Sequence, residues 1–382
     1  MTKDEESLLS SLTPFSAPGV TLNTAAWFDA AHTPAAQSPI DEFITNLYAI
    51  NRLYLGAETR GEYSPILGSL VYLGMVSAAE SYFRSLIRRL ILVDVHCQAN
   101  ASTRLVSYGA ALHHEADLLP EALLEGVSLA STRGVASELR NLCGISQMTK
   151  DGGVPKALQK LFDNFEAICQ IRHCGIHRFG KLGSQQALRL GMDSHAPLLE
   201  KPLRLTVRHL QDIAEALEAL VRGVNSYCFA DVIRRTHTAS PAGREKDKYY
   251  AEVWQRDAAQ DLDRFSKYYA IFACSVGPDS DKSKPMQDVY SAFLAYIKQY
   301  DSSAAPKSGA SRAASTPASS APTPAPHIPP RPASVPAAHE RTPVPVPTPA
   351  PQCASARVGT PKSASIGARI RAFLGSFRRD SR

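Results

Sequence analysis

Between residues 38 and 300 the apolar side chains recur every three or four positions, which is the period of an α-helix. Ser38-Pro39 supplies an N-cap serine and a proline in the first turn, and a helix is predicted from about 39 to 55. Ser64-Pro65 repeats this signal before a longer helix. The apolar stripe of that helix consists of Leu70, Leu73, Val76, Ala79, Phe83, Leu86, Ile87, Leu90 and Ile91.

The rest of this region also predicts helices. After short helical patterns up to about residue 150, the breaker Asp151-Gly-Gly153 precedes a helix that continues into ICQIRHCGIHRFG (168–180) and ends at Gly180 and Gly183. A long helix is expected over about 202–234, and further helical patterns cover 246–275 and 286–300. Because no series of alternating strands occurs, the predicted fold class is all-α: a helical bundle at 38–235 with a helical extension at 236–300.

The two ends of the chain differ in composition from this body. Residues 1–37 are polar and rich in Ala, Pro and Ser, and we expect a flexible segment. Fifteen of the 27 prolines lie between Pro306 and Pro361, so 301–361 is predicted to be a disordered linker. Its PHIPPR stretch (326–331) matches a PxxPxR docking pattern, which chance readily produces in such a tract.

Residues 362–382 are predicted to form a basic amphipathic helix. Their apolar residues fall at helical spacing and arginines occupy the positions between them. Such a helix suits an anionic membrane surface or the groove of a protein partner. A frayed chain end is the alternative, because about eighteen residues with two glycines are marginal as an isolated helix. The apolar set is Ile366, Ile370, Phe373, Leu374 and Phe377.

The charge of the chain is concentrated in its tail. The formal net charge is +6, but residues 301–382 carry eleven Lys/Arg against three acidic residues, which is +8 and leaves −2 for the first 300 residues. The basic pI is therefore no argument for a nucleic-acid-binding core.

Cysteine usage and the N-terminus indicate the cytoplasm. Seven cysteines, an odd number, lie mostly within apolar helical patterns, which favours reduced thiols that fill a core. The N-terminal stretch has acids where a signal peptide has bases, so no export is expected. The longest apolar run, Ile66 to Ala79, is too short to span a bilayer and predicts a buried helix. We expect a cytoplasmic protein, with peripheral membrane attachment through the tail as an option.

The stretch at 168–180 gathers candidate chemistry in thirteen positions. Cys169, His173, Cys174 and His177 are possible metal donors, but tetrahedral zinc normally takes two paired sets and no second CxxC or HxxxH set follows. No metal site is therefore predicted. Arg172 and the histidines also suit a purely structural role, because cations stabilise the C-terminal end of a helix dipole.

The order of residues in this stretch resembles a known family. Arg172-His173-Cys174-Gly175-Ile176-His177 reads R-x4-H near the end of the penultimate bundle helix, and the chain here is similar to the HEPN superfamily, whose endoribonucleases carry R-x4-6-H at this place. The stretch SAAESYFRSLIRRLI (77–91) looks like the superfamily's early helix with an acidic residue facing the site, here Glu80. The resemblance covers about residues 38–235.

This resemblance implies cleavage of RNA without a metal or cofactor. RNA carries its own nucleophile in the 2′-OH, so His177 is expected to act as the base and Arg172 to stabilise the negative charge that develops on the phosphate. His173 and Glu80 are expected to support them, and Arg178 to bind backbone phosphate. The alternatives are a surface role for His173, a solvated charge for Arg178, and a pair between Glu80 and Arg84.

The resemblance also implies a homodimer with a composite site, and an RNA-cleaving toxin or antiviral defence effector. Some related toxins carry R-x4-H-x-Y and are silenced by nucleotidylation of that tyrosine; Phe179 has no hydroxyl, so this control is unavailable here. Two other functions stay open: a non-catalytic HEPN-like module that binds RNA, a nucleotide or a protein, and a membrane-peripheral adaptor acting through 362–382. No GxxxxGK[ST] loop occurs, so ATP or GTP hydrolysis is not expected.

Overall fold

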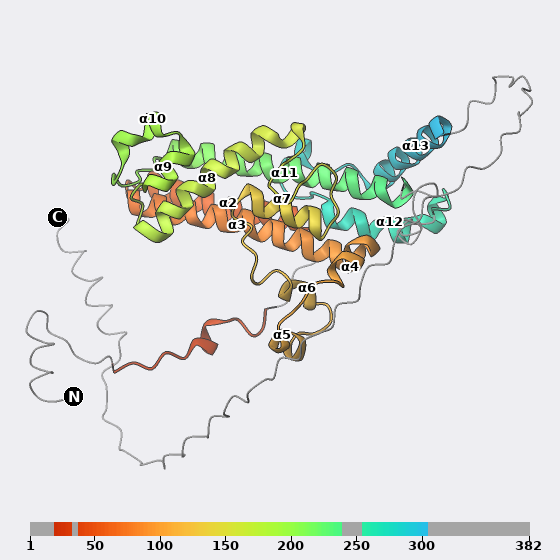
Figure 1. Cartoon of the computed structure of the whole chain (residues 1–382), viewed down its shortest axis with the longest axis horizontal. Coiled ribbons are helices and arrows are strands. Elements are labelled where there is room, and N and C mark those ends of the chain that lie inside the picture. Colours follow the sequence, from red (N-terminus) through yellow and green to blue (C-terminus); the bar gives the residue numbers. More distant parts are fainter. Residues whose placement is uncertain (1–18, 33–36, 239–253, 305–382) are drawn as a thin grey trace, which may run out of the picture. The chain divides into compact units, whose positions relative to one another are not determined.

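The computed structural model describes residues 19–32, 37–238 and 254–304, and these ranges contain helices and no strand (Figure 1). The prediction of an all-α protein is confirmed for them. Both predicted serine caps are present. Ser38 Oγ accepts the Asp41 N–H (3.2 Å) at the start of α2 (Pro39–Thr59), and Ser64 Oγ accepts the Leu67 N–H (3.2 Å) at the start of α3 (Pro65–Val93).

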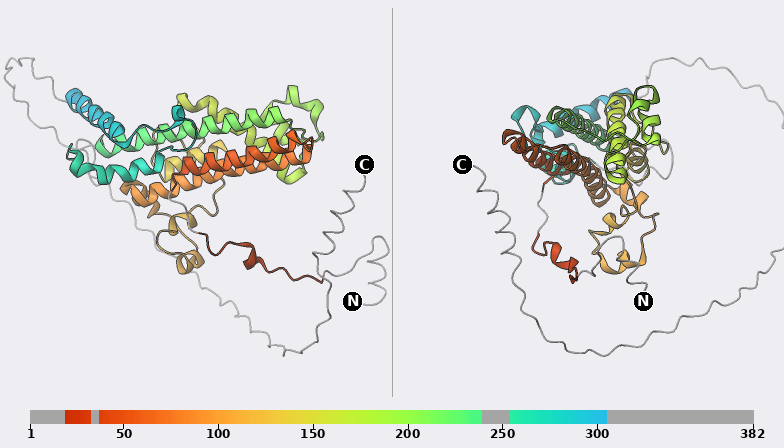
Figure 2. Two further views of the ribbon diagram at one scale, coloured as in Figure 1. Left: turned by 180° about the vertical axis from the view of Figure 1, so that it is seen from behind. Right: turned by 90° about the vertical axis from the view of Figure 1, so that its left-hand side faces the viewer.

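Four long helices pack against one another: α2, α3, α8 (Gln159–Arg178) and α11 (Val207–Thr238). The right-hand view of Figure 2 looks nearly along their axes. The predicted run of short helices between α3 and α8 is confirmed. It comprises α4 (Val95–Ala101), α5 (Tyr108–His113), α6 (Leu119–Ala122) and α7 (Thr132–Asn141), and a 3₁₀ turn (Lys156–Leu158) leads into α8.

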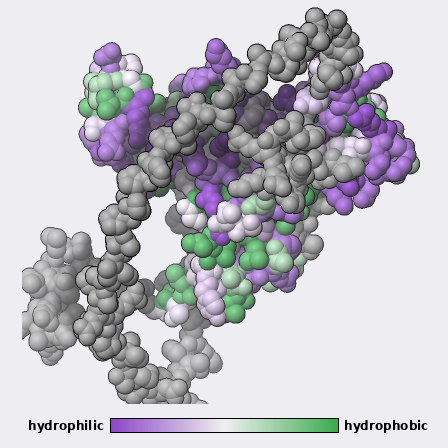
Figure 3. All heavy atoms as spheres, turned by 45° about the vertical axis from the view of Figure 1, so that its right-hand side comes forward, coloured by the Kyte–Doolittle hydropathy of each residue, from purple (hydrophilic) through white to green (hydrophobic). Residues whose placement is uncertain are grey.

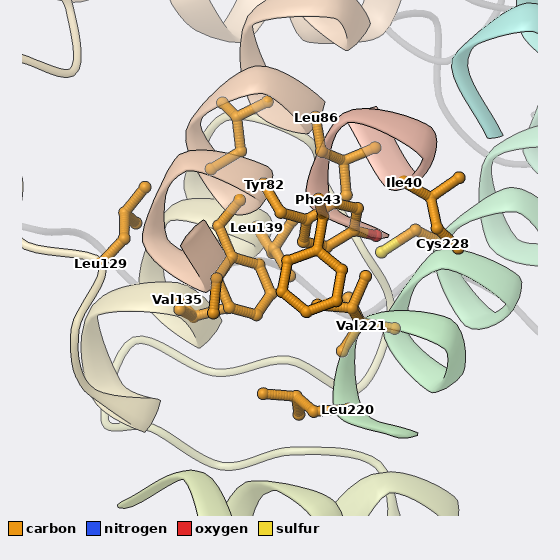
Figure 4. Close-up of a cluster of buried hydrophobic side chains, with 14 of the residues drawn as sticks. Ile40, Phe43, Tyr82, Leu86, Leu129, Val135, Leu139, Leu220, Val221 and Cys228 are labelled. Atoms are coloured by element: carbon orange, nitrogen blue, oxygen red, sulfur yellow. The ribbon is translucent and has the colours of Figure 1, made fainter. Parts of the chain in front are cut away.

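The core lies between these helices and is rich in aromatic rings (Figure 4). Tyr82 of α3 meets Phe43 of α2 and Phe83 edge-on, with ring centroids 6.2 and 5.2 Å apart. Such arrangements add to the stabilisation from buried area. The predicted stripe on α3 is correct from Val76 onward but wrong at Leu70, which is 63% exposed.

α3 is the one described helix that is long and apolar enough to cross a membrane by length and composition. Half of its most apolar window is buried, and the helix packs against α2, α8 and α11. Core helices of soluble proteins pass the same criterion, so the feature is weak evidence for a membrane span.

The start of α11 differs from the sequence prediction. The helix begins at Val207 rather than near 202, because residues 201–203 pair with 180–182 just after α8: Leu182 N–H donates to Lys201 O (3.1 Å) and Leu203 N–H to Gly180 O (2.9 Å). The connecting turns are α9 (Ser184–Leu190), α10 (Met192–His195) and a 3₁₀ turn (Ala196–Leu198).

The helical pattern predicted over 246–275 yields a shorter helix, α12 (Ala258–Phe272). Asp257 caps it, and the N–H groups of Gln255 and Arg256 donate to the Asp261 carboxylate (2.9 Å each), which holds the chain before α12 in a non-helical turn. Residues 246–253 lie outside the described ranges. A 3₁₀ turn (Asp279–Asp281) follows α12.

The last described helix, α13 (Met286–Ala304), passes the expected boundary at residue 301. Asp301 explains this extension, because its carboxylate bonds to His237 Nε2 (3.0 Å) and to the Arg256 guanidinium.

Residues after α12 are tied to the start of the bundle. The buried Asp41 carboxylate accepts the backbone N–H groups of Ser275 (2.7 Å) and Val276 (3.1 Å), and Ser38 Oγ donates to Ala273 O (2.5 Å). Side chains of α12 and α13 also join the same hydrophobic core as α2, α3 and α11.

On the face seen in Figure 3, apolar residues gather below the bundle, at the height of α5 and α6 in Figure 1. Residues 19–32 are exposed and contain one 3₁₀ turn (Thr24–Trp27).

Six cysteines are free and buried, as predicted: Cys97, Cys143, Cys169, Cys174, Cys228 and Cys274. Several predicted features lie outside the described residues. They are Cys353, the Pro-rich linker from residue 305 onward, the PHIPPR stretch and the expected helix at 362–382.

Candidate functional site

The carboxyl end of α8 presents the R-x4-H motif. The buried side chains Phe162, Phe165 and Cys169 fix this helix in the core, whereas its last turns reach the surface. Phe179 ends α8 in the left-handed region (φ 49°), and Gly180 follows at φ 85°. A Cβ at Gly180 would lie 3.3 Å from the Leu203 side chain, so this turn requires glycine.

Arg172 points from α8 toward α3. Its Nη2 lies 3.7 Å from Glu80 Oε2, and both side chains are about three-quarters buried, at 24% and 21% exposed. Glu80 Oε1 in turn accepts the Leu129 N–H (3.1 Å). The acidic residue of α3 that the resemblance singled out therefore faces the motif arginine at ion-pair distance.

Arg84, the other partner considered for Glu80, is engaged elsewhere. It donates to Glu121 Oε1 (3.2 Å) and to the carbonyls of Leu124 (2.7 Å) and Val127 (3.3 Å). Of the two alternatives left open by the sequence, the geometry favours the pair between Glu80 and Arg172.

The two histidines of the motif lie together on the exposed side of α8. The rings of His173 and His177 stack with centroids 5.7 Å apart and planes 26° apart. At about 100° per residue, Arg172 and His177 project about 140° apart around the helix axis. Within one chain the structure thus joins Arg172 to Glu80 and His173 to His177, and no described contact joins Arg172 to His177.

Sequence inspection missed two polar residues that continue the histidine stripe one and two turns back along α8. Gln170 Nε2 donates to Glu166 Oε1 (2.6 Å), and Glu166 Oε2 accepts the Thr132 N–H (3.0 Å) at the start of α7. Gln170 is buried, and its Oε1 has no hydrogen-bond partner. The signal that would have found them is the spacing i, i+4, i+7, i+11 over Glu166, Gln170, His173 and His177.

The surroundings of His173 lower its pKa. Partial burial is the main cause, followed by the charges of Arg172, His177 and Arg189 of α9, while Glu166 acts in the opposite direction. His173 is therefore neutral near pH 7. Because the unfolded chain binds this proton more readily, protonation of His173 destabilises the fold as pH falls below about 6.5.

We expect an NMR titration of the histidine rings to place the pKa of His173 below about 6.5. Arg189→Gln should raise this pKa by removing a nearby cation, and Glu166→Gln should lower it further. Arg140→Gln, at an exposed position on α7, is the charge-matched control and should leave it unchanged. If Arg189→Gln and Glu166→Gln shift the pKa in the same direction, the placement of these charges around His173 is wrong.

The possible thiol ligands point away from the histidines. Cys169 and Cys174 are 1% and 3% exposed, and burial raises the pKa of Cys169. Although Cys169, His173 and His177 follow one another at intervals of four, the cysteine faces the core and the histidines face solvent. Among the described residues no three His, Cys, Asp or Glu side chains converge on one point.

Arg178 and Phe179 complete the exposed end of α8. The Arg178 guanidinium pairs with Glu200 just before the 201–203 segment, and a phosphate at this exposed position would compete with that carboxylate. Phe179 is 86% exposed. It borders an apolar cavity of about 290 Å³ between the start of α3 and the end of α8, which is also lined by Ile66, Leu70, Leu73 and Leu203.

Comparison with protein-family models, curated proteins and solved structures found no match for this chain. The candidate site offers one exposed imidazole pair and one guanidinium beside a carboxylate. These groups are suited to proton transfer and to the stabilisation of an anion.

Proposed function

We propose that the protein is a metal-independent endoribonuclease of the HEPN type. The observation that carries the proposal is the R-x4-H sequence in the last turns of α8, with His177 exposed and Arg172 facing Glu80 of α3 at 3.7 Å. An exposed imidazole can meet a large substrate. Arg172 lies at ion-pair rather than hydrogen-bond distance from Glu80, so its N–H donors can still bond to a phosphate oxygen.

The reaction uses groups that RNA and these side chains supply. His177 takes the proton from the ribose 2′-OH, and the 2′-oxygen attacks the adjacent phosphorus. The P–O5′ bond breaks, which leaves a 2′,3′-cyclic phosphate, and the departing 5′-oxygen takes a proton from solvent. Arg172 stabilises the negative charge on the non-bridging oxygens.

A homodimer forms part of this proposal. Arg172 and His177 project about 140° apart around α8, so one phosphate reaches both more readily if two copies of α8 face each other. Each copy then contributes a different member of the pair to one composite site.

The test is cleavage of mixed cellular RNA by the purified full chain in excess EDTA, with analysis of the product ends. We expect RNA cleavage that continues in EDTA and leaves 2′,3′-cyclic phosphate ends. DNA incubated under the same conditions should stay intact. Cleavage that requires a metal, or DNA cut as fast as RNA, would contradict the proposal.

A non-catalytic helical module that binds RNA or a protein is the second candidate. It is favoured by one observation: the Arg172 guanidinium faces Glu80 and has no described contact with His177. A chain that binds RNA in a mobility-shift assay without cleaving it, at any metal concentration, would favour this candidate.

A further inference from the structure

A second polar site lies on another face of α3, around a cavity of about 440 Å³. Five residues of α3 line it at helical spacing and so share one side of the helix. Glu42 of α2 and Glu121 of α6 stand beside them. The α3 residues are Ser81, Arg84, Ser85, Arg88 and Arg89, and His32 and Gln37 complete the lining.

One of the three arginines has a structural task. Arg84 bonds to Glu121 and to the carbonyls of Leu124 and Val127, which attaches the segment after α6 to α3. Its charge is offset by Glu121. Arg84 is therefore part of the wall of the cavity and is not available to a ligand.

Arg88 and Arg89 have no such task. Neither has a hydrogen bond or ion pair with another described residue, although both are only partly exposed. The Arg88 Nε is buried and has no hydrogen-bond partner. Burial lowers the pKa of Arg89. The nearby Glu42 carboxylate acts to raise this pKa, and the positive charge of Arg88 lowers it further. Buried donors in native proteins nearly always have a partner, so the Arg88 Nε, with the Arg89 side chain next to it, is open to an acceptor that the described residues do not supply.

The chemistry of the lining selects the acceptor. Two guanidinium groups present forked N–H donors that match the oxygens of a phosphate, and the hydroxyls of Ser81 and Ser85 add further donors. A long polyanion is disfavoured, because the Glu42 carboxylate beside the two arginines would repel its neighbouring phosphates. The volume also lies within the range of about 300–1,000 Å³ that is usual for small-ligand pockets.

We propose that this cavity binds the phosphate group of a small phosphorylated molecule, with Arg88 and Arg89 as the phosphate-binding residues. The site is separate from the R-x4-H motif of α8 and does not depend on the proposed ribonuclease activity.

Titration calorimetry with sodium phosphate and sodium pyrophosphate tests the proposal, with sodium acetate at equal ionic strength as the control anion. We expect saturable binding of the phosphates by the full chain and none of acetate. Arg88→Gln and Arg89→Gln should each weaken binding about tenfold or more, the loss typical of one charge-assisted hydrogen bond. Arg140→Gln, an exposed arginine on α7, removes the same charge elsewhere and should have no effect.

A further variant separates binding from folding. Ser81 is exposed on α3, so Ser81→Asp keeps every arginine and places a competing carboxylate in the cavity; it should abolish phosphate binding while the melting temperature stays near that of wild type.

Two outcomes would overturn the proposal. One is phosphate binding that is equal in wild type, Arg88→Gln and Ser81→Asp. The other is that a twelve-nucleotide RNA displaces the bound phosphate and that Arg88→Gln weakens the binding of this RNA. The cavity would then be part of an RNA-binding surface.

Discussion

His177→Ala is expected to lower RNA cleavage by a factor of about 100 to 10,000, the contribution typical of a general base. The loss should appear in kcat, because the imidazole acts on the 2′-OH proton and adds little to RNA binding. His177 is exposed on the last turn of α8, so its removal should leave the stability of the fold nearly unchanged. The measurement is the single-turnover cleavage rate on a defined RNA, with the melting temperature recorded for each protein.

The matched control for this variant is His113→Ala, which removes an exposed histidine from the end of α5. It should cleave at the wild-type rate. If His113→Ala and His177→Ala lose the same activity, or neither loses any, His177 is not the base.

Arg172 calls for a substitution that preserves its pair with Glu80. Arg172→Lys keeps a positive charge near the Glu80 carboxylate but loses the forked donors that bind two phosphate oxygens. A strong loss of cleavage in a stably folded Arg172→Lys protein would indicate direct contact with phosphate. Wild-type activity in that protein would mean that only the charge of Arg172 matters.

The largest expected effect on stability is at Asp94, where four helices meet. This residue follows α3 and caps α4 by accepting the Cys97 N–H (2.9 Å). Its carboxylate also accepts Arg235 Nη2 of α11 (2.8 Å) and the Tyr268 hydroxyl of α12 (3.4 Å). The two charged side chains are 4% and 16% exposed. Burial alone would lower the pKa of Arg235, but Asp94 and its surroundings raise it.

Asp94→Ala should lower the free energy of unfolding by about 3–5 kcal/mol, because it leaves the Arg235 charge buried without its partner. Urea denaturation followed by circular dichroism measures this change. Asp212→Ala is the matched control: it breaks the exposed pair between Arg208 and Asp212 on α11 and should cost less than about 1 kcal/mol.

The double variant Asp94→Ala/Arg235→Leu identifies the cause. Once no charge remains buried at this junction, it should recover part of the stability lost in Asp94→Ala. A loss at Asp94 no larger than that at Asp212 would show that this junction contributes little to the fold.

The sequence by itself determined that the described part is all-α and where several of its long helices start. Period-3.6 apolar patterns and serine–proline caps are local signals, so the starts of α2 and α3 could be predicted before any tertiary contact was known. The R-x4-H spacing is likewise a local feature of the sequence, whereas Glu80 was singled out by the resemblance of 77–91 to the early helix of the HEPN superfamily. The starts of α11 and α12 depend on other segments and were missed. Helix α11 begins later than predicted because 201–203 pairs with 180–182. Helix α12 begins later because the Asp261 carboxylate accepts hydrogen bonds from the turn before it.

Only the tertiary structure decided which charged groups meet. Glu80 has Arg84 one turn away in the sequence, yet it pairs with Arg172 from α8, because Arg84 is drawn to Glu121 and two carbonyls. The same packing leaves Arg88 and Arg89 beside a cavity, with no ion pair to any of the residues that the structure describes. The spacing of residues along a helix determines on which side of that helix a side chain lies. Its partner is fixed by how other helices pack against that side, which depends on contacts between residues far apart in the chain.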